Sequence, residues 1–485
     1  MTTYSPHAAS RRTRLATWRA VATALAWGTA VILVGTAVAY LVAEGRWYLA
    51  LGLLASVPLM ILIFRQPLAT IALWALVTPF VSVTDVASVR QVFWLVHRGL
   101  PLVVLLVIVL GSISGVDERR LPRLGWPELL MAGYVVASLL SIAYTSGDGL
   151  ATGYLLYERV VVPMCLYLIV RLLQPSWNDV RRMVPVAMFV LVTQSVVGIL
   201  SWVVPGVLPR MWLSHVGERT VGTFGDPDVF GTTMLVCGWL ILHVGLSTSF
   251  RTRDRVWPVL GFSLAMLMTF LTFSRGNWLA GLVVLAGALW LYRRFARLVI
   301  GVAVGVAVLL LASGVLTEQL EFAQRRLASE KSEEAALSRL PVAVAGIRMF
   351  EEKPLVGWGY GNFDLYSRRY QTRVADLVSA EKPHSSHNLF LSILAEQGAL
   401  GFALFMGPMM LWFLRFRSIA PNMLSAQRTF VAGLWLLIAA YVLVNNFSVM
   451  RAPFGLGLWW LALGAVAAAV SRAQLNTDPR GAEAP

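Results

Sequence analysis

The sequence predicts an all-α protein, a polytopic transmembrane helical bundle of about fourteen spans with one large extracytoplasmic loop. Apolar residues make up 58% of the 485 residues and charged residues only 13%, whereas a soluble domain carries about 25% charged residues. The mean hydropathy is +0.70. The apolar residues are collected in long runs and do not alternate with polar ones, which favours membrane helices over an outer-membrane barrel.

The apolar runs follow one another along the whole chain, and a helix needs about 20 apolar residues to cross a bilayer. The first run is too long for the core of a signal peptide, so it counts as the first span. Twelve to fourteen spans fit the pattern. We expect a cytoplasmic tail at 1–19, spans one to eleven within 20–316 (at about 20–43, 47–64, 67–83, 100–116, 126–144, 152–173, 183–204, 228–248, 256–273, 276–292 and 298–316), spans twelve to fourteen within 388–471 (at about 388–414, 429–449 and 454–471), and a cytoplasmic tail at 472–485.

The arginines between the runs predict the orientation of the chain. Of the 40 basic residues 37 are arginine, and many of them stand in pairs and triplets. With the N-terminus in the cytoplasm, the clusters in the short connections fall on the cytoplasmic side, whereas the short outer loops carry only single arginines, as the positive-inside rule requires. The net charge of +15 therefore reflects topology, and we expect no nucleic-acid partner. The clusters include Arg181 and Arg182; Arg293, Arg294 and Arg297; and Arg415 and Arg417.

Residues 317–387 form one long polar connection. They contain all three lysines and ten of the 25 acidic residues, and the alternation of spans places them outside the cytoplasm. A helix is expected from Glu318 to Ile347, with an apolar face that continues to Phe350 before Pro354 and a run of glycines. A loop of this length in a compact protein is usually functional.

Three short motifs lie on the predicted outer side: RTVGTFGDPDVFG, TFSRGNW and PHSSHNLFLSILAEQGALG. They contribute Arg219, Arg275 and His387, respectively, and His384 lies close to His387. Two arginines can grip a diphosphate through charge-assisted, bidentate hydrogen bonds. An imidazole can take a proton from a hydroxyl group near neutral pH.

Each of these residues also has an ordinary structural interpretation. Arg219 and Arg275 suit contacts with lipid headgroups. Asn388 and the serines before it predict the cap of a helix that begins near Leu389, beside which the histidine is incidental. Glu396, two turns into that helix, is expected to form a structural hydrogen bond.

Further charged residues lie in the sixth span and in the long loop. Glu158 and Arg159 are adjacent about two turns inside the span, so they point to different faces and each needs its own partner. Arg159 is a candidate for substrate contact. Arg368 and Arg369, with Arg373, are candidates for binding donor or acceptor phosphates. Their alternative is a solvated helix of the loop.

The sequence predicts no metal and no cofactor. Cys165 and Cys237 lie inside apolar runs, where a thiol behaves as a small hydrophobic group, so neither a disulfide framework nor zinc-ligand spacing is indicated. The predicted outer loops contain no HExxH motif, no paired acids and no Cys/His cluster.

Taken in order, the segments SRGNWLAGLVVL, RMFEEKPLVGWGYGNF and SHNLFLSILAEQGALG resemble the O-antigen ligase and O-antigen polymerase superfamily. The resemblance covers about 220–407, whereas the first seven spans match the family only in their hydropathy. It implies a glycosyltransferase that moves a glycan from an undecaprenyl-diphosphate carrier to an acceptor hydroxyl at the outer face of the bacterial inner membrane. The family's two arginines correspond to Arg219 and Arg275, and its histidine before asparagine corresponds to His387. His384 is less clearly matched.

The residues themselves suggest a mechanism for such a transfer. The arginines hold the diphosphate, and the histidine deprotonates the acceptor hydroxyl, which attacks the anomeric carbon directly and so inverts it. Without a metal motif in the outer loops, the arginines take the place of a divalent ion. The expected partners are the undecaprenyl-diphosphate-linked glycan donor, a lipid or glycan acceptor, and membrane lipid. Ligases, polymerases and protein O-oligosaccharyltransferases share these motifs, so the acceptor stays open. A transporter or flippase of lipid-linked sugars and a scaffold are the alternatives from other classes.

Overall fold

The structure is a computed structural model that describes residues 35–80, 91, 93–115, 121–145, 147–214, 219–247, 255–312, 317, 321, 324, 339–370, 386–449 and 453–477. Within these residues the chain forms helices and no strand. The predicted all-α fold class is therefore confirmed. The chain divides into two compact units, Met1–Ala69 and Thr70–Pro485.

The described part of the first unit is helical. Residues 35–43 form a helix, followed by α2 (Trp47–Arg65) and the start of α3 (Pro67–Val77). Along α2 the side chains of Ile61 and Phe64 are about half exposed, at 50% and 53%. Apolar side chains in that position suit a helix that faces lipid.

The second unit contains the remaining helices. Every predicted apolar run from residue 47 onward overlaps a helix, while most of the first run lies outside the described residues. The helices after α3 are α5 (Leu100–Ile113), α6 (Trp126–Thr145), α7 (Gly149–Leu156), α8 (Val162–Leu173), α9 (Trp177–Arg182), α10 (Val184–Val203), α11 (Pro227–Ser247), α12 (Val256–Phe270), α13 (Arg275–Leu291), α14 (Ala296–Ala312), α17 (Arg339–Glu352), α18 (Phe363–Tyr366), α19 (Leu389–Ile419), α20 (Ser425–Asn445) and α21 (Pro453–Thr477).

The number of spans remains a prediction. Among the described residues, 7 helices are long and apolar enough to cross a membrane, or up to 8 if the pair α13 and Arg293–Gly305, bent by 97°, counts as one span. Other predicted runs are shorter helices, such as α12. Residues 149–173 form one continuous helical stretch, but its charged residues lower its hydropathy.

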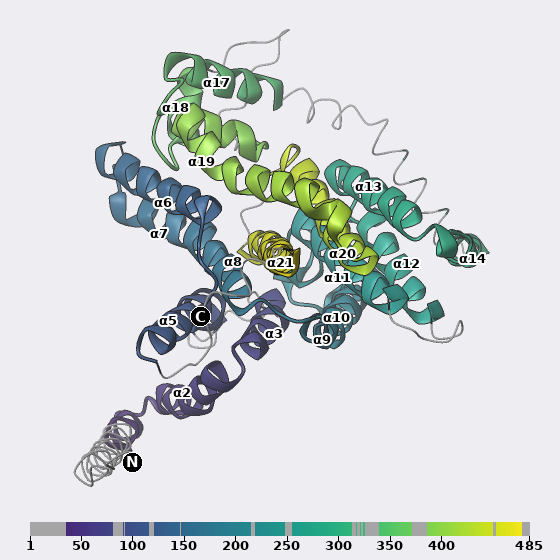
Figure 1. Cartoon of the computed structure of the whole chain (residues 1–485), viewed down its shortest axis with the longest axis horizontal. Coiled ribbons are helices and arrows are strands. Elements are labelled where there is room, and N and C mark those ends of the chain that lie inside the picture. The colour runs from purple at the N-terminus through teal and green to yellow at the C-terminus, as the bar shows by residue number, and fades with distance from the viewer. Residues whose placement is uncertain are drawn as a thin grey trace, which may run out of the picture. The chain divides into compact units, whose positions relative to one another are not determined.

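Helices α11 and α21 form the centre of the second unit. The hydrophobic windows of α11 and α21 are 89% and 72% buried, against 28% for α6. Helix α21 packs against α8, α11, α19 and α20 (Figure 1). Glycines permit this close packing: a Cβ atom added at Gly464 would lie 2.8 Å from the Tyr167 carbonyl oxygen on α8.

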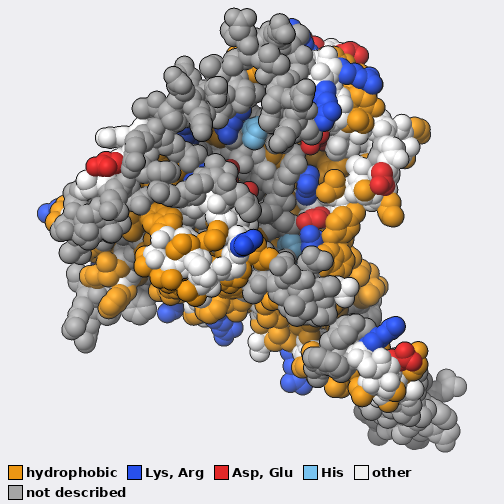
Figure 2. Space-filling view, turned by 180° about the vertical axis from the view of Figure 1, so that it is seen from behind, with side chains coloured by type: hydrophobic (Ala, Val, Ile, Leu, Met, Phe, Trp, Pro, Cys, Tyr) orange, Lys and Arg blue, Asp and Glu red, His pale blue; other side chains and the backbone are white. Residues whose placement is uncertain are grey.

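Apolar side chains cover much of the visible surface of the described residues, with small groups of basic side chains between them (Figure 2). On α6, Leu139 and Leu140 are 52% and 56% exposed, and on α13, Leu282 is 62% exposed. Such exposure is unfavourable in water and natural in lipid. The surface therefore agrees with a polytopic membrane protein.

Some contacts join helix ends that the sequence places on the same side of the membrane. At ends predicted to be cytoplasmic, the Arg255 guanidinium lies 4.7 Å from the centre of the Phe295 ring. At ends predicted to be outer, the Thr220 backbone N–H donates to the Leu271 carbonyl at 3.1 Å. Which of these ends face the cytoplasm stays a prediction.

Helix α19 is broken at Gly398, whose φ of 63° and ψ of −167° are not helical. Residues 354–359 pair with the backbone exposed by this break. A Cβ atom at Gly357 would lie 2.4 Å from the Glu396 carbonyl carbon, so only glycine fits there. This part of the long loop is thus fixed to α19. The bonds run from Trp358 N to Ala395 O (3.1 Å), Gly359 N to Glu396 O (2.6 Å), Ala399 N to Pro354 O (2.7 Å) and Leu400 N to Leu355 O (3.2 Å).

Within the long loop, α17 overlaps the predicted helix but covers Arg339–Glu352. Most of 318–338 lies outside the described residues.

Candidate functional site

The turn that carries Arg219 contacts the hinge between α12 and α13. Arg219 donates from Nε to the Thr272 carbonyl at 2.9 Å. Thr272 lies three residues before Arg275, the first residue of α13. The first two predicted motifs, more than fifty residues apart in the chain, are therefore in direct contact.

Further hydrogen bonds lock the same two motifs together. The Asn277 side chain donates from Nδ2 to the Pro227 carbonyl at 2.9 Å, and the Ser274 hydroxyl donates to the Asp228 carboxylate. A Cβ atom at Gly231 would lie 2.3 Å from Asn277 Nδ2, so only glycine permits this packing. The exposed Arg275 side chain consequently extends from a rigid base.

His387 lies in a strained turn directly before α19. Its φ is 52°, in the left-handed region that non-glycine residues rarely adopt, and Phe273, two residues before Arg275, has a φ of 50°. Such strain collects at functional sites. The next residue, Asn388, caps α19 by accepting the Leu391 N–H at 3.0 Å, so the predicted cap is confirmed.

The Arg275 and His387 turns meet at residues 444–449, which we call the α20 end. Asn388 donates from Nδ2 to Asn446 Oδ1 at 3.3 Å. A Cβ atom at Gly276 would lie 3.4 Å from Phe447 Cβ. Together with the bond from Arg219 to the hinge, these contacts gather all three predicted motifs around one helix end.

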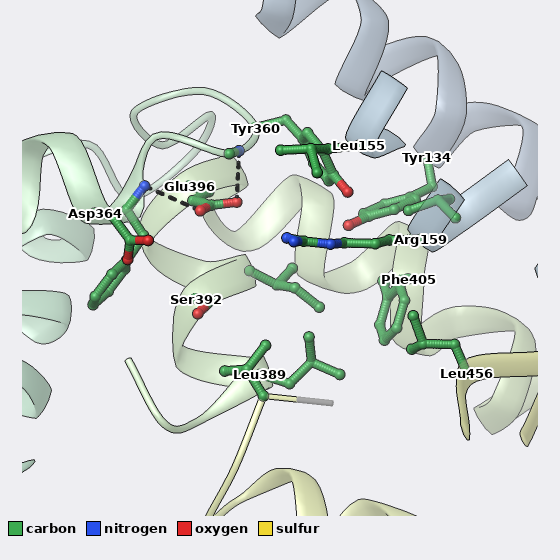
Figure 3. Close-up of a pocket in the computed structure, with 15 residues that line it drawn as sticks. Tyr134, Leu155, Arg159, Tyr360, Asp364, Leu389, Ser392, Glu396, Phe405 and Leu456 are labelled. Carbon is green, nitrogen blue, oxygen red and sulfur yellow. Dashed lines mark hydrogen bonds between the residues drawn. The ribbon is translucent and has the colours of Figure 1, made fainter. Parts of the chain in front are cut away.

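A cavity of about 160 Å³ adjoins the His387 turn (Figure 3). Ser392 lines it and shares a hydrogen bond with Ser386, the neighbour of His387. Val449 of the α20 end also lines it. Its other walls come from α6, α7, α19, α21, the turn before α8 and residues 360–364 of the long loop.

Arg159 extends into this cavity, whereas its neighbour Glu158 does not line it. Glu158 pairs with Arg98 at 2.6 Å. Both residues belong to the π-helical turn Tyr157–Val161, which directs the two side chains to different surroundings. Glu158 thus has the separate partner expected of it, in Arg98.

Glu396 forms the structural hydrogen bonds expected of it and also lines the cavity. Its carboxylate accepts the Gly361 N–H at 2.9 Å and the Phe363 N–H at 3.0 Å. Tyr360, from the same loop, is 8% exposed. Burial, followed by the nearby Glu396 carboxylate, raises the pKa of Tyr360, so its hydroxyl stays protonated and able to donate at neutral pH.

Two of the remaining predicted residues lie away from the cavity. Arg368 and Arg369 are exposed in the 3-10 turn Ser367–Arg369 and do not line the cavity, and the Arg369 guanidinium lies 5.2 Å from the Tyr366 ring centre. His384 and Arg373 lie outside the described residues.

Neither cysteine belongs to the site. Cys165 and Cys237 are buried and form no disulfide. Within the described ranges, no three His, Cys, Asp or Glu side chains are grouped so that they could hold a metal ion.

Residues 260–406 match the family model described as O-antigen ligase. No curated protein matches the chain. The matched segment contains Arg275, His387 and Glu396, while Arg219 and Arg159 precede it. The predicted resemblance is thereby confirmed over residues 260–406, where the chain carries an O-antigen ligase domain.

Proposed function

We propose that the protein transfers a glycan from an undecaprenyl-diphosphate carrier to an acceptor hydroxyl at the outer face of the bacterial inner membrane. Its family supports a membrane glycosyltransferase of the O-antigen ligase or polymerase type. The observation that supports the reaction best is the meeting of the Arg219, Arg275 and His387 turns around the α20 end.

In this proposal Arg219 and Arg275 bind the diphosphate of the donor. The bond from Arg219 Nε to Thr272 orients its guanidinium plane, and the packing of Gly276 fixes the start of α13. Two preorganised cations stabilise the charge that grows on the diphosphate as the sugar–phosphate bond breaks. They supply the stabilisation that a divalent ion gives in other transferases, so the proposed reaction needs no metal.

His387 acts as the general base. Its neutral imidazole accepts the proton of the acceptor hydroxyl. The acceptor oxygen then forms a bond to the anomeric carbon while the bond to the diphosphate oxygen breaks and its electron pair leaves with the diphosphate. A single displacement of this kind inverts the anomeric configuration.

Reconstitution tests the proposal. The purified protein in proteoliposomes is given an undecaprenyl-diphosphate oligosaccharide with one of three acceptors: lipid A core, a second copy of the donor, or an acceptor protein. We expect a product of increased mass with one of them, in the presence of EDTA as well. Movement of a fluorescent donor between leaflets without transfer would instead support a flippase. Transfer to the protein alone would identify a protein O-oligosaccharyltransferase.

A further inference from the structure

We propose that the cavity beside the His387 turn binds one uncharged sugar residue of the substrate, through Arg159, Tyr134, Tyr360 and Glu396. The inference rests on the proposed glycosyl transfer and specifies which part of a substrate this cavity takes. Ligand sites for drug-sized molecules usually measure about 300–1,000 Å³. At about 160 Å³ the cavity is too small for an oligosaccharide and suits a single ring.

The polar groups in the cavity suit hydroxyl groups, which both donate and accept. The Arg159 side chain runs between Tyr134 and Phe405, and its guanidinium points toward the Glu396 carboxylate (Figure 3). The hydroxyl groups of Tyr134 and Tyr360 lie beside the Arg159 side chain (Figure 3). A sugar between these groups meets donors from arginine and tyrosine and an acceptor from glutamate.

Glu396 keeps the capacity to accept further hydrogen bonds. A carboxylate offers about four lone-pair positions. The backbone N–H groups of Gly361 and Phe363 occupy one position on each oxygen. These two bonds also hold the carboxylate still, so its remaining lone pairs have a fixed direction.

The apolar part of the lining suits the C–H face of a sugar ring. Phe405, Leu389, Ile393 and Leu456 contribute to the wall of the cavity. A few placed polar groups on an apolar wall are characteristic of small-ligand sites. A phosphate ion would gain no favourable contact from these four apolar side chains.

The cavity provides the carboxyl groups of Glu396 and Asp364 against the one guanidinium of Arg159, which does not suit an anionic group. Under the proposed function the diphosphate is bound by the two guanidinium groups of Arg219 and Arg275, although Asp228 also lies there and bonds to Ser274. With the diphosphate bound by those arginines, an uncharged part of the substrate is left for the cavity.

The cavity lies next to the His387 turn, because Ser392 lines the cavity and shares a hydrogen bond with Ser386. A sugar bound in the cavity would therefore lie near the proposed base. A sugar bound there is either the acceptor whose hydroxyl loses a proton or the first sugar of the donor. The acceptor sugar and the donor sugar present the same hydroxyl groups to the cavity, so the KM values for donor and acceptor are needed to tell them apart.

Direct binding of free glycosides tests the proposal. Saturation-transfer NMR on the detergent-purified protein compares methyl glucoside, methyl N-acetylglucosaminide and glucuronate. Tyr360→Phe removes one hydroxyl, and Tyr144→Phe is a matched control, because Tyr144 lies on α6 and is 86% exposed. We expect an uncharged glycoside to bind the wild type and the control equally, and to bind Tyr360→Phe and Arg159→Gln roughly threefold to tenfold more weakly. No binding of any uncharged glycoside, equal binding by all variants, or tighter binding of glucuronate would overturn the proposal.

Steady-state kinetics assign the sugar. In Tyr360→Phe, a raised KM for the acceptor with an unchanged donor KM identifies an acceptor site, and the reverse identifies a donor site. Unchanged KM values for both substrates would overturn the proposal. His387→Ala should abolish transfer yet keep glycoside binding. If the wild-type protein binds glycosides but transfers no glycan, the proposed function alone is refuted, whereas transfer by the wild type without glycoside binding would refute the cavity assignment alone.

Discussion

Two polar regions adjoin the α20 end, and they differ in charge and in how their residues are held. Around Arg219 and Arg275 the motifs bond to each other, Arg219 to Thr272 and Asn277 to Pro227. Around the cavity, side chains from separate helices are completed by a loop that Glu396 holds in place. One region thus presents two guanidinium groups near the Asp226 and Asp228 carboxylates, and the other offers mixed hydrogen-bonding groups on an apolar wall. Under the proposed function the first region binds the diphosphate and the second binds the sugar.

The largest effect is expected from His387→Ala. Removing a general base typically costs on the order of 10²- to 10⁴-fold in rate. Turnover of the purified variant with a lipid-linked donor measures it. If the variant keeps more than about a tenth of the rate, a loss of under ~1.4 kcal/mol, His387 is not the base.

Arg275→Lys should lower transfer on the order of 10- to 100-fold, because a planar two-pronged donor is replaced by a point charge. Arg417→Lys is the matched control, since Arg417 is exposed near the other end of α19 and should tolerate the change. The rate of glycan transfer by each purified variant measures the effect. Wild-type activity in Arg275→Lys would make Arg275 a lipid-facing anchor.

Two glycine variants should disturb the two regions separately. Gly231→Ala brings a Cβ atom within 2.3 Å of Asn277 Nδ2, and Gly359→Ala brings one within 1.9 Å of Thr145 Oγ1 at a φ of 91°. We expect each to cost about 1–3 kcal/mol of stability. Thermal unfolding measures the loss. Glycoside binding should weaken in Gly359→Ala and persist in Gly231→Ala; equal weakening would mean that the regions are not independent.

Labelling of single introduced cysteines tests on which side of the membrane each loop lies, and it needs no measurement of activity. Cys165 and Cys237 are buried, so an introduced cysteine reports alone. In intact cells, Ser329→Cys in the long loop should react with a membrane-impermeant thiol reagent. Ser425→Cys, exposed at the start of α20, should react only after permeabilisation. The reverse pattern would place the candidate site on the cytoplasmic face.

Local features were predictable from the sequence. The apolar runs located the helices, and Asn388 was recognisable as a cap because its partner Leu391 is three residues away. Arg275 and His387 stood out because polar residues in turns between apolar runs are conspicuous.

Features that depend on distant residues were not predictable. The cavity joins Arg159, Tyr360 and Glu396, which are more than two hundred residues apart at the extremes. Tyr134 gave no signal in the sequence, and Tyr360 lies in a segment that carries the family resemblance but was not singled out as a site residue. Hydropathy does not reveal the 97° bend after α13. The two apolar runs on either side of it were therefore predicted to be two ordinary spans.

The anomeric configuration of the transferred linkage tests the account most directly. The purified protein is incubated with an undecaprenyl-diphosphate oligosaccharide of known configuration, and the new glycosidic bond is assigned by NMR. Direct attack by an acceptor that His387 has deprotonated, with the diphosphate held by Arg219 and Arg275, predicts complete inversion. Retention of configuration, or transfer that persists when all three residues are replaced, would contradict the account.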